Sequence, residues 1–179
     1  MHPNRKGFSL LELLLVVSVG TSLMMAGIAA YKNVMFNVQM AQIAQLMGTM
    51  QAQIDWSYGS RNYYPNGNML DDLVAQRVFP ATIPTVGSGD SMYARLPLGI
   101  YQITGHVQTY DVTIDAINGA ACIKIAEIVT PANNTKLTQM SVNDTVYKAK
   151  NSNDYNGLRQ KLLTNCRQTD ANKIVWTFR

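Results

Sequence analysis

The chain begins with a long apolar stretch and changes to a mixed polar and apolar pattern near residue 55. Between residues 8 and 54 the only formal charges are Glu12 and Lys32, whereas residues 55–179 hold 22 of the 26 charged side chains. Residues 13–31 are 19 consecutive uncharged, mostly apolar positions. A helix of that length just crosses a hydrocarbon core of about 30 Å. The pattern predicts one membrane-spanning helix followed by a soluble part.

No proline occurs between residue 8 and Pro65, so the same helix can continue through residues 32–58. Its second half carries apolar side chains at alternating spacings of three and four, the positions that form one face of a helix. They are Phe36, Met40, Ile43, Met47, Met50 and Ile54. The first interpretation of this stripe is packing on the chain's own sheet. The other faces are uncharged, which favours further contact with other chains, as in a filament core.

Residues 59–97 are rich in glycine and proline and predict a connecting loop region with one short helix, capped by Asn68. Residues 98–107 and 110–116 then predict two strands joined by a tight turn. We expect a helix at 120–127, irregular or strand structure over 130–147, a helix at 158–166 and a terminal strand at 173–179. The expected fold class is α+β: a long N-terminal helix packed on a C-terminal antiparallel sheet.

Composition and charge narrow the class further. The chain has 179 residues, 47% of them hydrophobic, and a formal net charge of +4. These values exclude collagen-like, low-complexity and disordered chains. So small a positive bias gives no argument for binding nucleic acid.

The residues before the apolar stretch predict its orientation. Arg5 and Lys6 precede it, which places the N-terminus on the cytoplasmic side and the rest of the chain outside. Small residues such as Ser22 and Ala26 leave open a cleaved secretory signal or a simple anchor. Against that alternative, Glu12 lies inside the apolar run, where a carboxylate is costly and usually functional. Its partner is expected to come from outside the chain.

Residues 6–13, KGFSLLEL, resemble the processing site of type IV prepilins. This resemblance implies that a prepilin peptidase cuts after Gly7, removes residues 1–7 as a leader and methylates the new N-terminal Phe8. It also implies that the ammonium of Phe8 pairs with Glu12 of a neighbouring subunit. A buried carboxylate left unpaired is strongly destabilising, so Glu12 is expected to set the register of assembly.

The C-terminal half extends the resemblance. Ala121-Cys122-Ile123 after a strand pair, and Cys166 before a late strand, are similar to type IVb pilins, including the bundle-forming and conjugative-plasmid kinds. The resemblance implies a Cys122–Cys166 disulfide. Such a bond forms in an oxidising compartment, as expected for an exported domain.

Candidate enzymatic features are weak. His106 has no second histidine nearby, and His2 lies in the leader, so we expect no metal site. Cys122 with His106 could form a nucleophile and base, although a disulfide is favoured. The sequons at Asn133 and Asn143 match a glycosylation pattern that bacteria seldom use. We expect no enzyme and no cofactor.

The expected organisation is a leader over 1–7, a transmembrane and filament-core helix over 8–31, its amphipathic continuation over 32–58, the connector over 59–97 and the sheet domain over 98–179. The expected function is that of a major pilin, a homo-oligomeric filament subunit used for adhesion, aggregation or mating contact. The expected partners are the inner membrane, the prepilin peptidase, an assembly ATPase, a platform protein and an outer-membrane secretin. The alternatives are a minor pilin or secretion pseudopilin and, from another class, an anchored exported binding protein.

Overall fold

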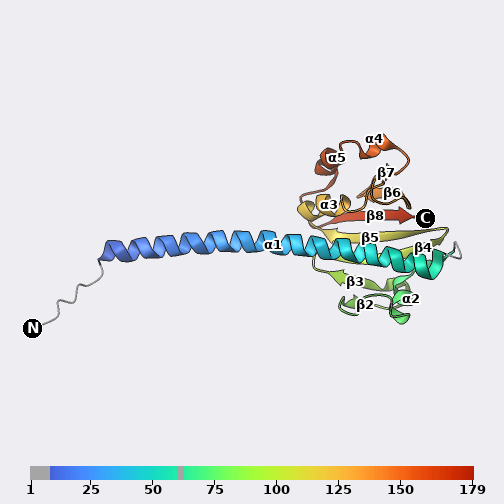
Figure 1. The fold of residues 1–179 in the computed structure, drawn as a ribbon, viewed down its shortest axis with the longest axis horizontal. Coiled ribbons are helices and arrows are strands. Elements are labelled where there is room, and N and C mark those ends of the chain that lie inside the picture. The colour runs from blue at the N-terminus through green and yellow to red at the C-terminus, as the bar shows by residue number, and fades with distance from the viewer. Residues whose placement is uncertain (1–8, 60–62) are drawn as a thin grey trace, which may run out of the picture. The chain divides into compact units, whose positions relative to one another are not determined.

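The computed structural model describes residues 9–59 and 63–179 (Figure 1). By internal contacts the chain divides into two units, one ending at Val38 and the other spanning Gln39–Arg179. The helices are α1 (Leu10–Tyr58), α2 (Leu70–Ala75), α3 (Gly119–Ala126), α4 (Ser152–Tyr155), α5 (Leu158–Asn165) and the 3-10 helix η2 (Gly89–Ser91). The strands are β1 (Tyr64–Asn68), β2 (Thr85–Val86), β3 (Tyr93–Leu96), β4 (Gly99–Val107), β5 (Thr109–Ile117), β6 (Leu137–Val142), β7 (Thr145–Lys148) and β8 (Asn172–Phe178).

Helix α1 runs unbroken over 49 residues, which confirms the long N-terminal helix. Within the second unit its apolar stripe is buried from Ile43 onward, through Met47, Met50 and Ile54, and Leu46 joins it. The first interpretation of the stripe is therefore correct for these residues, because they form part of the domain's own core.

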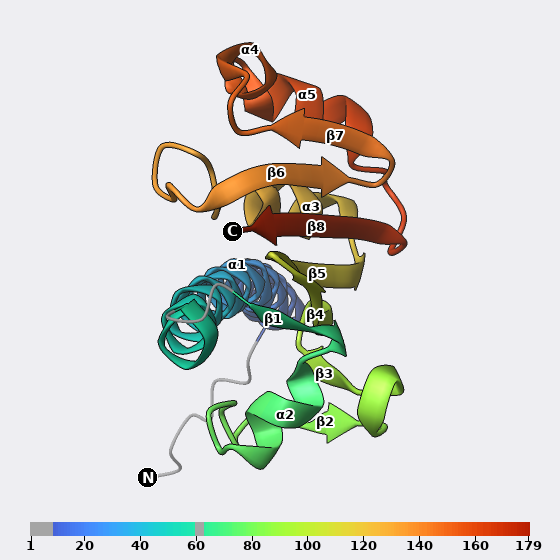
Figure 2. The same ribbon diagram turned by 90° about the vertical axis from the view of Figure 1, so that its right-hand side faces the viewer.

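All strand pairs in the sheet are antiparallel, and the order is β2-β3-β4-β5-β8-β6-β7, with β1 also paired to β4. The C-terminal strand β8 lies between β5 and β6 (Figure 2). Its alternate residues Ile174, Trp176 and Phe178 are fully buried, as the period of two along a strand requires. The last strand therefore completes the core.

The structure corrects the prediction that residues 59–97 are a connecting loop region with a short helix. Helix α2 is present, but three strands of the sheet, β1, β2 and β3, also fall in this segment. Strand β1 has the sequence YPNGN and pairs with β4 through an irregularity between Tyr64 and Gly67. Proline and glycine are tolerated in a strand at such a bulge. Pairing with β4 has overridden the local preference of this sequence for a turn.

Asn172 is the polar centre of the C-terminal region. Its side chain is fully buried, and the two N–H groups of Nδ2 are shared among the carbonyls of Ile117, Arg167 and Thr169, which lie 2.9, 3.0 and 2.9 Å away. Its Oδ1 accepts from the Arg167 N–H at 2.7 Å and from Asn143 Nδ2 at 3.1 Å. One side chain thereby connects β5, the loop before β8 and the β6–β7 turn.

We predict that Asn172→Asp lowers the free energy of unfolding by about 3 kcal/mol, because a buried carboxylate of the same shape cannot donate to the carbonyls that surround it. The measurement is urea unfolding of the full chain in detergent, followed by tryptophan fluorescence. Asn156→Asp, at an exposed position, is the matched control and should shift stability by less than about 0.5 kcal/mol. Equal stability of the two variants would contradict the role given to Asn172.

Buried tyrosines link stability to alkaline pH. Burial raises the pKa of Tyr101 and of Tyr110 well above the usual value, and Asp55 raises that of Tyr110 further. Burial, with the nearby Asp154 carboxylate, raises the pKa of Tyr155 to about 12. A raised folded-state pKa means that this stability is fully present below about pH 10 and is lost as the pH rises further.

We predict that Tyr101→Phe changes stability little at pH 7, because in the described part of the chain the Tyr101 hydroxyl has no hydrogen-bond partner. Above pH 10 the variant should lose stability less steeply than the wild type, by about 1.4 kcal/mol per pH unit. Urea unfolding at pH 8 and pH 11 measures the difference. Parallel pH profiles for the two proteins would refute this account.

Candidate functional site

Glu12 lies in the first turn of α1 and is exposed. The carbonyl of Ser9 accepts hydrogen bonds from the N–H groups of Glu12 and Leu13 at 3.0 and 3.1 Å, which starts the helix at this point. Lys32 is the only basic residue of α1, and it lies 20 positions on, about 30 Å along the helix. No cation of the described helix can therefore reach the Glu12 carboxylate. Gly7 and Phe8 lie outside the described residues, so the processing motif stays a prediction.

Helix α1 is the one helix in the described part that is long and apolar enough to cross a membrane, with a mean hydropathy of 2.1 over its most apolar window. The large side chains of its first half are exposed; Leu10, Leu23 and Met25 are 77%, 69% and 74% accessible. These apolar side chains need a lipid environment or another protein surface to cover them.

The polar side chains of this apolar segment are satisfied within the helix. Ser18 donates to the carbonyl of Leu15, and Thr21 and Ser22 donate to the carbonyl of Ser18, each at 2.9 Å. Hydroxyls bonded in this way need no hydrogen bond to water. They can therefore lie in a hydrocarbon environment, where no water is present. Apart from Glu12, this segment thus presents a surface without free polar groups.

The sheet domain contains the predicted disulfide. Cys122 in α3 and Cys166 at the end of α5 are bonded, with 5.9 Å between their Cα atoms. The bond joins α3, which follows β5, to the segment that leads into β8, and so encloses β6, β7, α4 and α5 in one covalent loop. Because the Cys122 sulfur is in a disulfide, it cannot serve as a nucleophile beside His106. The His106 ring instead lies 3.1 Å from Asp111.

Both glycosylation sequons have their amide groups engaged. Asn133 Nδ2 donates to the carbonyl of Ile128 at 2.8 Å. Asn143 Nδ2 donates to the carbonyl of Asn165 at 2.7 Å.

A polar cluster that sequence reasoning missed fastens the end of α1 to the segment before β6. Lys136 Nζ lies 2.7 Å from Asp55 Oδ1, and Asn134 Nδ2 donates to Gln51 Oε1 at 2.7 Å. Tyr64 packs beneath this cluster, and its pKa is raised, chiefly by burial and then by the Asp55 carboxylate. Asp55 begins the charged part of the sequence, but no sequence signal indicated its partner.

Comparison with protein families then identifies the chain. The family model described as PilS N terminal matches residues 35–179. The chain belongs to this family, which is related to the type IV pilins. The match includes the second half of α1 and the whole sheet domain, and it lies downstream of the processing motif. No curated protein sequence matches the chain.

A solved pilin shares the fold. The chain is similar to TcpA, a type IV pilin from Vibrio cholerae El Tor biotype, with a TM-score of 0.53 and 15% identity. The alignment covers 79% of this chain and 99% of TcpA. The long helix, the antiparallel sheet and the disulfide together are a pilin fold. Together with the family, this fold identifies the chain as a pilin subunit, a structural protein.

We predict that Cys122→Ala, Cys166→Ala or both lower the free energy of unfolding by about 4 kcal/mol, because the bond closes a loop of about 45 residues. That loss is a large share of the about 5–15 kcal/mol typical of a domain. Urea unfolding of the oxidised and reduced chain measures it. The double variant should match either single variant, and stability unaffected by reduction would contradict the prediction.

Proposed function

We propose that this chain is a major subunit of a type IV pilus of the IVb kind. Its proposed place before assembly is the inner membrane, with the N-terminus in the cytoplasm. After assembly it forms an extracellular homopolymeric filament for adhesion, aggregation or mating contact. The observation that carries the proposal is an apolar helix, exposed in the single chain and preceded by a carboxylate, joined to a pilin-fold domain.

The apolar helix suits both states of such a subunit. In the membrane, lipid covers residues 13–31, and Lys32 lies where the span ends and can reach the interface. In the filament, helices of other copies replace the lipid, and subunits add by repeated heterologous contacts that do not close into a ring. A prepilin peptidase, an assembly ATPase, a platform protein and an outer-membrane secretin are the partners that this transfer requires.

Glu12 is the proposed register device. Cleavage after Gly7 would leave an ammonium at Phe8, and in the filament this group pairs with Glu12 of a neighbouring copy. In a core without water, removing either the ammonium or the carboxylate leaves the other charge buried and unpaired, which costs about 3–5 kcal/mol. The exposure of Glu12, with no cation of its own helix within reach, supports this assignment.

We predict that the mature chain begins at Phe8 and carries one additional methyl group on its amine. Mass spectrometry of the intact protein and of its N-terminal peptide measures both features. Gly7→Val should leave an uncut precursor in the membrane, because a side chain at this position obstructs the peptidase. A mature N-terminus at Met1, or beyond Ala26, would exclude the proposal in favour of an anchor or a cleaved signal.

We predict that Glu12→Val leaves expression, cleavage and membrane residence near normal and abolishes filaments. A membrane monomer tolerates the loss of the carboxylate, whereas a filament repeats the unpaired charge in every subunit. Electron microscopy and the mass of sheared surface protein measure assembly. Filaments at wild-type yield would show that Glu12 is merely tolerated, and a low share of this chain in wild-type filaments would indicate a minor pilin.

A further inference from the structure

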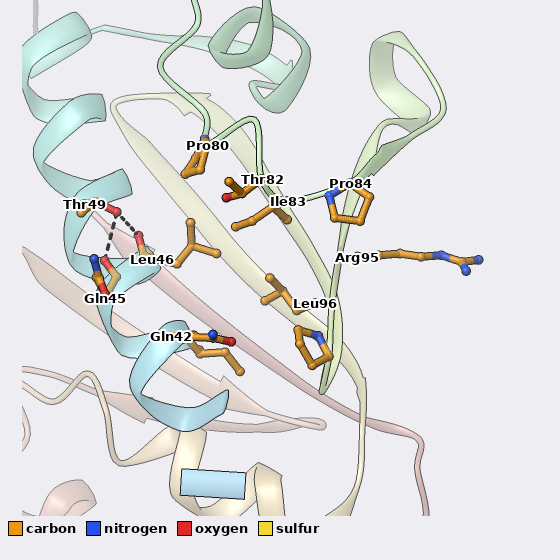
Figure 3. Close-up of a pocket in the computed structure, with 12 residues that line it drawn as sticks. Gln42, Gln45, Leu46, Thr49, Pro80, Thr82, Ile83, Pro84, Arg95 and Leu96 are labelled. Atoms are coloured by element: carbon orange, nitrogen blue, oxygen red, sulfur yellow. Dashed lines mark hydrogen bonds between the residues drawn. The ribbon is translucent and has the colours of Figure 1, made fainter. Parts of the chain in front are cut away.

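The domain formed by Gln39–Arg179 has an open groove of about 600 Å³ between α1 and the loop that precedes β2 (Figure 3). One wall is α1 at Gln42, Gln45, Leu46 and Thr49; the other is the loop from Pro80 to Pro84 together with the end of β3 and Pro97. The groove belongs neither to the disulfide region nor to the N-terminal segment. Pilin assembly as described so far makes no use of it.

Apolar side chains make up much of the groove lining, and Gln42, Gln45 and Thr82 add neutral polar groups. The Thr49 hydroxyl is engaged by its own helix, 3.0 Å from the carbonyls of Gln45 and Leu46. The Arg95 side chain points away from the groove in Figure 3, so its charge does not enter it. Since the groove holds no charge to pair with an ion, an uncharged and largely apolar occupant suits it best.

The loop wall does not suit an extended peptide. Pro80, Pro84 and Pro97 have no backbone N–H to donate. The N–H of Ile83 is bonded to the carbonyl of Pro80 at 3.1 Å, and that of Arg95 to the carbonyl of Pro84 at 2.9 Å. Strand addition needs a row of free donors and acceptors along an edge. This wall instead presents ring and aliphatic surface for side chains to pack against.

The helix wall suits a rod-like partner. Gln42, Gln45 and Thr49 lie three and four positions apart, so they form one ridge of α1 that runs about 10 Å along the helix. The groove follows this ridge. An apolar helix lying beside α1 can place its side chains in such a groove and keep its backbone hydrogen bonds internal.

We propose that this groove receives residues 13–31 of helix α1 from a second copy of the chain. The inference rests on the proposed filament. The same chain supplies an uncharged apolar helix whose large side chains are exposed, and a filament must cover them once the lipid is lost. The groove matches this segment in its lack of charge, and one of its walls is α1 itself.

The first test places a charge in the groove. Thr82 and Gln45 line the groove and are exposed in the single chain. Replacing either by Glu should therefore leave folding, and the amount of the protein in the membrane, normal. Burying the carboxylate against an apolar helix should lower the yield of sheared filaments at least tenfold. Gln53→Glu, at an exposed position of α1 that does not line the groove, is the matched control. Thr82→Glu and Gln45→Glu filaments at the Gln53→Glu yield would overturn the proposal.

The second test identifies the occupant. A photoreactive amino acid replaces Thr82 in subunits that co-assemble with isotope-labelled wild type, and sheared filaments are irradiated. The expected product joins the Thr82 position to the labelled peptide that ends at Lys32. A crosslink to residues 39–179 of the labelled copy, a crosslink to lipid, or no crosslink would overturn the proposal. The same amino acid at Gln53 should not give the expected product.

These experiments distinguish failure of the filament proposal from failure of the groove proposal. If the wild-type chain forms no filaments, the proposed function fails, and the groove proposal fails with it. If wild type and the groove variants assemble equally and the Thr82 crosslink lies elsewhere, the filament stands and only the assignment of the groove fails.

Discussion

The apolar side chains along the first half of α1 have to be shielded from water, and the rest of the structure depends on this requirement. Met24 and Met25 are 72% and 74% exposed in the single subunit, and their neighbours along the segment are similar. Burial of apolar surface stabilises by about 25 cal/mol per Å², so leaving this surface in water is strongly unfavourable. A subunit that moves from lipid into a packed helical core meets the requirement in both places. A monomer in water would leave these side chains uncovered.

The domain meets a second requirement, which is to hold the other half of the same helix firmly. One face of α1 belongs to the domain core, through Ile43, Leu46, Met47, Met50 and Ile54. The pairs Asp55–Lys136 and Gln51–Asn134 fasten the last turns of α1 to the segment before β6. The disulfide and the Asn172 network secure the region around β8, the strand that lies between β5 and β6.

Much of this architecture could be predicted from the sequence because the signals were local. The absence of charge and of proline predicted α1, and β-branched and aromatic residues such as Tyr101, Ile103, Val112 and Ile114 predicted β4 and β5. Strand β1 could not be predicted, because Pro65, Asn66 and Gly67 read as a turn until pairing with β4 is known. The roles of Asn172 and the groove were equally hidden. Both depend on segments far apart in the sequence, and neither leaves a periodic pattern.

The candidate site also had features that could be predicted from the sequence and features that could not. The Cys122–Cys166 pair came from resemblance and is present in the structure, and the carboxylate of Glu12 was evident as a charge within an apolar run. The proposed partner of Glu12 belongs to another copy of the chain, and a single chain's sequence and fold do not contain it. The family and the fold identify a pilin subunit, and the arrangement of subunits is a property of the polymer.

Helical reconstruction by electron cryo-microscopy of sheared surface filaments tests the central claim most directly. The account predicts a filament built from this chain, with residues 13–31 in the interior, in contact with helices of other copies, and residues 39–179 on the outside. Filaments in which this chain is absent, or in which residues 13–31 remain uncovered by neighbouring copies, would contradict it.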